Sequence, residues 1–65
     1  MTQGEKAVFA SAFVTECLAG KYPREAAKCA ATAILYLRTA QMTDGPCLDI
    51  ADDKFVMECT QAMLQ

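Results

Sequence analysis

The feature that most constrains this chain is a long central stretch without helix breakers. No glycine or proline lies between Pro23 and Gly45. Proline suits the first position of a helix because its missing N–H would have no partner there, and Glu25 faces the positive end of the helix dipole. The sequence therefore predicts a helix from Pro23 to about residue 42. A turn should follow at residues 43–46, where aspartate, glycine and proline are clustered.

A first helix is predicted upstream by a capping box. Thr2 and Glu5 have the S/T-x-x-E spacing, in which each side chain bonds the backbone N–H of the other residue. Apolar residues at helical spacing then form one stripe, made of Phe9, Ala10, Phe13, Val14, Cys17 and Leu18. Gly20 can adopt the positive φ that closes a helix, so this helix should cover about residues 3–19. The short connection to Pro23 favours an antiparallel hairpin.

A third helix is predicted at the C-terminal end of the chain. Asp49 can cap it, and Asp52 and Asp53 suit the positive end of its dipole. Its apolar stripe consists of Phe55, Val56, Cys59, Ala62 and Met63. This helix should cover about residues 49–64 and pack across the hairpin. We therefore expect a single all-α domain of three helices that spans residues 1–65.

The central helix is apolar around most of its circumference. Two seams with steps of three and four residues could each face a different helix; they are Ala27, Ala30, Ile34 and Leu37, and Ala26, Cys29, Ala33, Tyr36 and Ala40. Leu35 falls with Lys28, Thr32 and Thr39 on the remaining side, where a solvated helix would normally be polar.

Several apolar residues fall outside these stripes. Besides Leu35, these are Met57 and Leu64, which lie seven residues apart on the third helix. Apolar residues make up 54% of the chain, yet a chain of 65 residues buries only roughly 60% of its unfolded surface. We therefore expect an interface formed by Leu35, Tyr36, Met57 and Leu64, in a homo-oligomer or with a helical protein partner. The alternative is a monomeric three-helix bundle whose alanines reflect helix propensity.

The residue types give little support to catalysis. The chain has no histidine, no G-x-S-x-G elbow and no glycine-rich phosphate loop, so we expect no catalytic residues and no cofactor. Asp49, Asp52 and Asp53 lack the order of a calcium loop and fit helix capping better. The four cysteines have the spacing C-x11-C-x17-C-x11-C, without the close pairs typical of zinc sites. We expect free thiols and no metal, with Cys47 exposed in the loop; disulfides or a metal site are the alternatives.

Charge and hydropathy limit the partners and the cellular compartment that we expect for the protein. The net charge of -2 and the pI near 4.8 disfavour a general attraction to nucleic acid. The apolar runs are shorter than the ~18 residues that a spanning helix needs, so we expect no membrane partner. Glu5 offsets Lys6, and Glu16 interrupts the first apolar region, so a signal peptide is not expected. These observations favour a cytoplasmic protein.

One local resemblance provides a second hypothesis. The segments FVTECLAG (13–20) and PREAA (23–27), separated by a short turn, are similar to the opening of a helix-turn-helix in phage small terminase subunits or related regulators. The resemblance implies DNA contacts by Lys21, Arg24 and Lys28. It departs from the family because no second turn follows Ala27. The sequence favours a non-catalytic helical adaptor or regulatory protein; the alternative is a small phage-type or transcriptional DNA-binding regulator.

Overall fold

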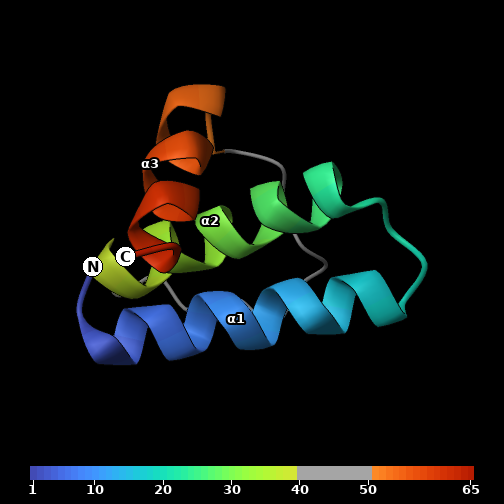
Figure 1. Ribbon diagram of the computed structural model, residues 1–65, viewed down its shortest axis with the longest axis horizontal. Helices are drawn as coiled ribbons and strands as arrows, with labels where there is room; N and C mark the ends of the chain where they lie inside the picture. Colours follow the sequence, from blue (N-terminus) through green and yellow to red (C-terminus); the bar gives the residue numbers. More distant parts are fainter. Residues whose placement is uncertain (40–50) are drawn as a thin grey trace.

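The computed structural model describes residues 1–39 and 51–65 of the chain, and these residues form three helices without any strand. Helix α1 covers Gln3–Leu18, α2 covers Pro23–Thr39 and α3 covers Asp53–Met63. Helices α1 and α2 lie side by side in opposite directions, and α3 stands across them and packs mainly on α2 (Figure 1). The predicted all-α, three-helix fold is confirmed. None of the described helices is long and apolar enough to cross a bilayer.

Helix α1 begins and ends as its sequence predicts. The backbone N–H of Glu5 donates to the Thr2 hydroxyl over 3.0 Å, and the N–H of Thr2 donates to the Glu5 carboxylate over 2.9 Å. At the other end, Gly20 has a φ of 99°. The N–H groups of Gly20 and Lys21 bond the carbonyls of Cys17 and Glu16, which is the Schellman pattern. This closure reverses the chain into α2.

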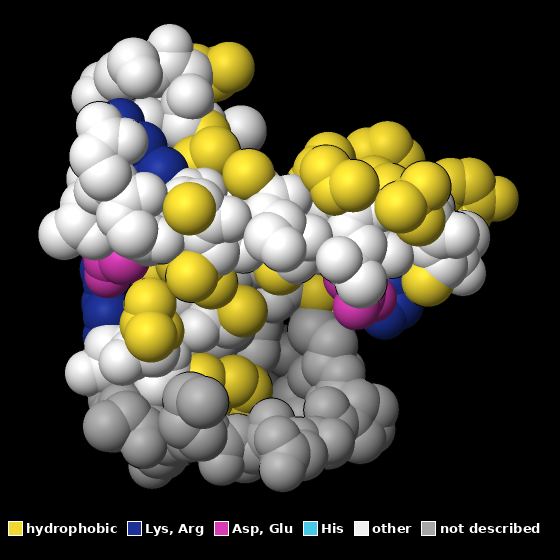
Figure 2. Space-filling model, turned by 90° about the horizontal axis from the view of Figure 1, so that it is seen from below, with side chains coloured by type: hydrophobic (Ala, Val, Ile, Leu, Met, Phe, Trp, Pro, Cys, Tyr) yellow, Lys and Arg dark blue, Asp and Glu magenta, His cyan; other side chains and the backbone are white. Residues whose placement is uncertain are grey.

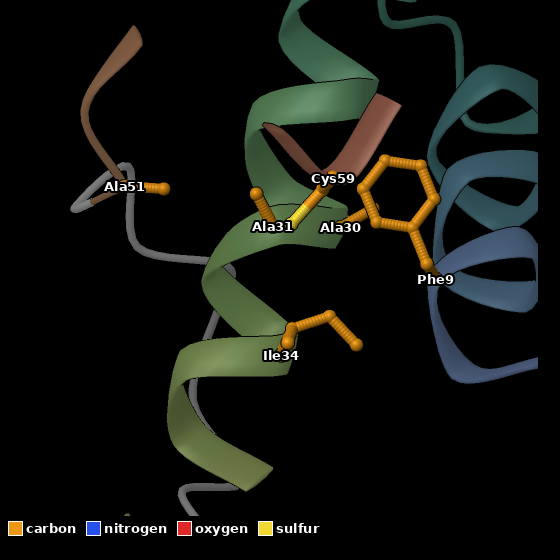
Figure 3. Packing of buried hydrophobic residues seen from close by; sticks show 6 residues of the cluster. All are labelled: Phe9, Ala30, Ala31, Ile34, Ala51 and Cys59. Carbon is orange, nitrogen blue, oxygen red and sulfur yellow. The ribbon is translucent and has the colours of Figure 1, made fainter. Parts of the chain in front are cut away.

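The core lies where the three helices meet on α2 (Figure 3). Phe9 of α1 points towards Ala30 of α2, and Cys59 of α3 reaches the same place. Ile34 is fully buried one turn further along α2. The small alanine side chains let the neighbouring helices approach α2 closely. Helix α2 is apolar on most sides because it is the central helix and contacts both of the others.

A further side of α2 is covered by the chain itself. Thr32 is 1% exposed, and its hydroxyl accepts a hydrogen bond of 3.2 Å from the N–H of Ala51. Ala51 packs on the side of α2 away from Phe9 (Figure 3), beside buried Ala31. Leu35 is partly buried and also packs against the core. Thr32 and Leu35 are thus covered within the chain itself, and helix periodicity did not reveal the contact with Ala51, which is distant in the sequence.

The bounds of the later helices differ from those predicted. Helix α3 begins at Asp53, and the side chain of Asp52 caps it by accepting from the N–H of Phe55 over 2.8 Å. Residues 51 and 52 are not helical, so Asp49 does not cap this helix as predicted. The expected end of α2 near residue 42, the turn at 43–46, Ala40, Asp49 and Cys47 all lie outside the described residues.

An arginine joins the three helices near the start of α1. The Arg38 Nε of α2 donates to the Glu5 carboxylate of α1 over 2.7 Å. The guanidinium also lies 5.6 Å from the ring centroid of Phe55 in α3, within cation–π distance. The hydrogen bonds from Arg38 and from the Thr2 backbone lower the pKa of Glu5 to about 2.

Candidate protein-interaction surface

The outward side of α1 is exposed and uncharged. No charged residue occurs from residue 7 to residue 15. The exposed residues of this helix in and just after that stretch are Ala7, Val8, Ala10, Ser11, Val14, Thr15 and Leu18. Val14 is 53% exposed and Leu18 is 84% exposed, and Tyr22 follows in the connection at 76%. A helix that is apolar on both its inner and outer sides is normally covered on both.

The predicted apolar stripe of α1 is divided by the structure. Phe9 is buried, Phe13 is partly buried against the core, and Cys17 is partly buried. Ala10, Val14 and Leu18 are the exposed edge of the same stripe. They remain uncovered because α3 is short and packs mainly on α2.

An apolar groove of about 480 Å³ opens beside this exposed edge. Its lining residues come from all three helices and are Phe9, Ala10, Phe13, Val14, Pro23, Arg24, Ala27, Thr60, Met63 and Leu64. Figure 2 shows hydrophobic side chains gathered on the arm that holds the C-terminal part of α1. It also shows a hollow between this arm and the lobe that holds α3. Among the described residues that line this groove, Arg24 is the one with a charge.

A second groove of about 640 Å³ lies between α2 and α3 and has a mixed lining. It shares Arg24 and Thr60 with the apolar groove, so the two hollows are neighbours. The remaining lining residues are Glu25, Lys28, Asp53, Val56 and Met57. Acidic and basic side chains occur together here, so this groove presents no uniform charge.

The structure separates the four residues predicted to form an interface. Met57 and Leu64 are exposed on α3, as expected for residues off its stripe. Leu64 lines the apolar groove, whereas Met57 lines the mixed one. Leu35 and Tyr36 are partly buried in α2, and Leu35 packs against the core of its own chain. The interface role of all four stays a prediction.

The predicted basic cluster is divided in a similar way. Lys21 forms an ion pair with Glu16, and its Nζ also lies 3.8 Å from the sulfur of Cys29. Lys28 shares the mixed groove with Glu25 and Asp53. Arg24 is exposed at the boundary of both grooves. The positive charge of this edge is thus accompanied by nearby carboxylates.

Three of the four cysteines fall within the described residues. Cys29 and Cys59 are buried, Cys17 is partly buried, and all three are free thiols. Burial raises the pKa of the Cys59 thiol above its ordinary value. Within residues 1–39 and 51–65, no group of three or more cysteine or acidic side chains is placed to hold a metal ion. The redox state of the thiols in solution stays a prediction.

Comparison of the chain with protein-family models, curated proteins and solved structures finds no match. The surface must therefore be interpreted from its own chemistry. Sequence reasoning missed the outward side of α1, although one signal could have found it. The run of uncharged residues between Lys6 and Glu16 is longer than two helical turns, so it must leave an uncharged outer side.

Proposed function

We propose that this protein is a non-catalytic helical adaptor or regulatory protein that acts by association of helices. The observation that carries the proposal is the exposed, uncharged outer side of α1. Four of the seven large apolar residues exposed in the described part of the chain lie on α1 or directly after it: Val8, Val14, Leu18 and Tyr22. Contiguous exposed apolar surface of this kind marks contact sites for proteins.

The spacing of the exposed residues on α1 supports contact with another helix. Ala7, Ser11, Val14 and Leu18 recur with steps of three and four residues and thus share one side of the helix. Small residues allow a second helix axis to approach closely, and each apolar Å² removed from water contributes about 25 cal/mol. With free thiols and this surface, the proposal places the protein in the cytoplasm, bound to a second copy or to a helical partner.

Analytical ultracentrifugation at micromolar concentration tests the proposal. We expect a dimer or larger species, or a stable complex with a helical protein that copurifies from native extract. Strictly monomeric behaviour at high concentration, together with the absence of any copurifying helical protein, would overturn it.

DNA binding is the weaker candidate. Helices of a helix-turn-helix motif meet at about 90–120°, whereas α1 and α2 lie side by side in opposite directions (Figure 1). The ion pair of Lys21 with Glu16 reduces the charge available to phosphates. Salt-sensitive duplex binding that is lost on reversing Lys21 and Arg24 would reverse this ranking.

A further inference from the structure

We propose that the apolar groove between the three helices binds an amphipathic helix from another protein, which carries an acidic residue that pairs with Arg24. This inference rests on the proposed function and adds the chemistry of the partner. The shape of the groove, the charge of Arg24 and the helices that a second copy offers in its described parts support it.

The walls of the groove limit the size of its occupant. One wall is formed by α1 from Phe9 to Val14 and the other by α3 from Thr60 to Leu64. At 1.5 Å per residue, these walls are roughly 6–8 Å long. Ala27 of α2 lines the groove together with these walls. A helix that lies along walls of this length can place large apolar side chains at positions i and i+3 or i+4 against them.

The positive charge of Arg24 indicates that the partner helix carries an acidic residue. Arg24 is exposed, and it forms no ion pair with any described residue. It is the second residue of α2, where the helix dipole contributes further positive potential. Its planar guanidinium can donate two parallel hydrogen bonds to a carboxylate, and the apolar lining strengthens such a pair by excluding water.

A second copy of the chain does not offer the required helix in its described parts. The outer side of α1 carries the exposed Val14 and Leu18, but it has no charged residue from residue 7 to residue 15 and so brings no carboxylate to Arg24. Met57 and Leu64 are seven residues apart on α3, but the exposed residues between them on that side, Thr60 and Gln61, are polar. The occupant is therefore a helix from a different protein.

The test uses displayed helical peptides selected on the full-length protein. The peptides are about 15 residues long, because shorter isolated helices are marginal in water. Each carries apolar residues at i and i+4, while the positions around them are randomised among acidic, basic and neutral residues. We expect enrichment of one acidic residue at a fixed distance from the apolar positions. Selection on Arg24→Glu should enrich a basic residue at that same position.

Two matched pairs of variants locate the binding site. Arg24→Glu should weaken the selected peptides by about tenfold or more, whereas Lys54→Glu, a reversal on exposed α3 surface outside both grooves, should not. Leu64→Gln should weaken binding, whereas Leu18→Gln should not, although the two leucines are 83% and 84% exposed. Circular dichroism checks that every variant keeps its helix content.

The remaining outcomes overturn the inference. These are failure to enrich peptides, enrichment without an acidic preference, and equal effects of Arg24→Glu and Lys54→Glu. Loss of self-association on Leu64→Gln, with competition between the peptides and a second copy, would show that the groove serves a homo-oligomer. None of these results refutes the proposed function, which sedimentation tests independently.

Discussion

Thr32 shows how one hydroxyl group determines which side of α2 is covered. Its hydroxyl donates to the carbonyl of Lys28 over 2.9 Å and accepts from the N–H of Ala51. The second bond satisfies a buried backbone donor and fixes the segment before α3 against α2. A threonine in a helix gives no sign in the sequence of such a distant partner, so its burial could not be predicted from periodicity.

We expect Thr32→Val to lower the free energy of unfolding by about 1–3 kcal/mol, because the buried N–H of Ala51 loses its acceptor while the side-chain volume is kept. Urea denaturation followed by circular dichroism measures the change. Thr60→Val is the matched control, since the Thr60 hydroxyl also donates to a carbonyl four residues earlier, over 2.9 Å, but at an exposed site. Equal effects of the two substitutions would contradict the role of Thr32.

Glu5 makes the stability of the fold depend on pH. Its pKa is about 2 in the folded chain, against 4.5 as its ordinary value. The stability that the ionised Glu5 carboxylate contributes to the fold is therefore present above about pH 4.5. It is lost as the pH falls towards 2, because a proton binds this carboxylate more readily in the unfolded chain. We expect Glu5→Gln to flatten the acid limb of a plot of melting temperature against pH. Glu25→Gln, which also removes a carboxylate from the first turn of a helix, should leave this limb in place.

At the scale of the helices, the sequence predicts the helix ends that depend on neighbouring residues better than those that depend on distant contacts. The capping box at Thr2, the closure at Gly20 and the start at Pro23 all lie within a few residues of the groups they bond, and all three are confirmed. The start of α3 was misplaced because Asp49, Asp52 and Asp53 are all competent caps, and the contact of Ala51 with Thr32 selects among them. The groove depends on how far α3 extends over α1, which periodicity does not specify.

The two glycines associated with α1 should respond in opposite directions to alanine. Gly20→Ala places a side chain at a φ of 99°, which L-residues rarely adopt, and should destabilise the fold by about 1–2 kcal/mol. Gly4 is helical, and a Cβ there would meet the Thr2 hydroxyl at an ordinary 3.9 Å. Gly4→Ala should therefore stabilise the fold by about 0.5 kcal/mol. Chemical denaturation of both variants tests these signs, and a stable Gly20→Ala protein would show that the turn can be rebuilt.

At the scale of the molecule, the surplus of apolar residues lies on a different helix from the one that the sequence emphasised. Helix α2 is apolar around most of its circumference, but a central helix of a small bundle needs that composition. Helix α1 has the outer position in the hairpin, and there the same composition leaves Val14 and Leu18 exposed. Composition predicted that apolar surface would remain, whereas its location depended on which helix occupies the centre.

This difference leads to a prediction that separates folding from association. Leu35 packs against the core, so Leu35→Ala should lower the free energy of unfolding by about 1–3 kcal/mol and leave association of the folded chains unchanged. Leu18 is 84% exposed at the end of α1, where a positive charge suits the helix dipole, so Leu18→Lys should leave stability nearly unchanged. In an interface formed by the outer side of α1, that charge would be desolvated, and association should weaken strongly. Urea denaturation and sedimentation of both variants measure the two effects. Leu35→Ala could instead dissociate the protein without lowering its free energy of unfolding, while Leu18→Lys leaves association unchanged. In that case the contact surface is on α2 and the outer side of α1 is not the interface.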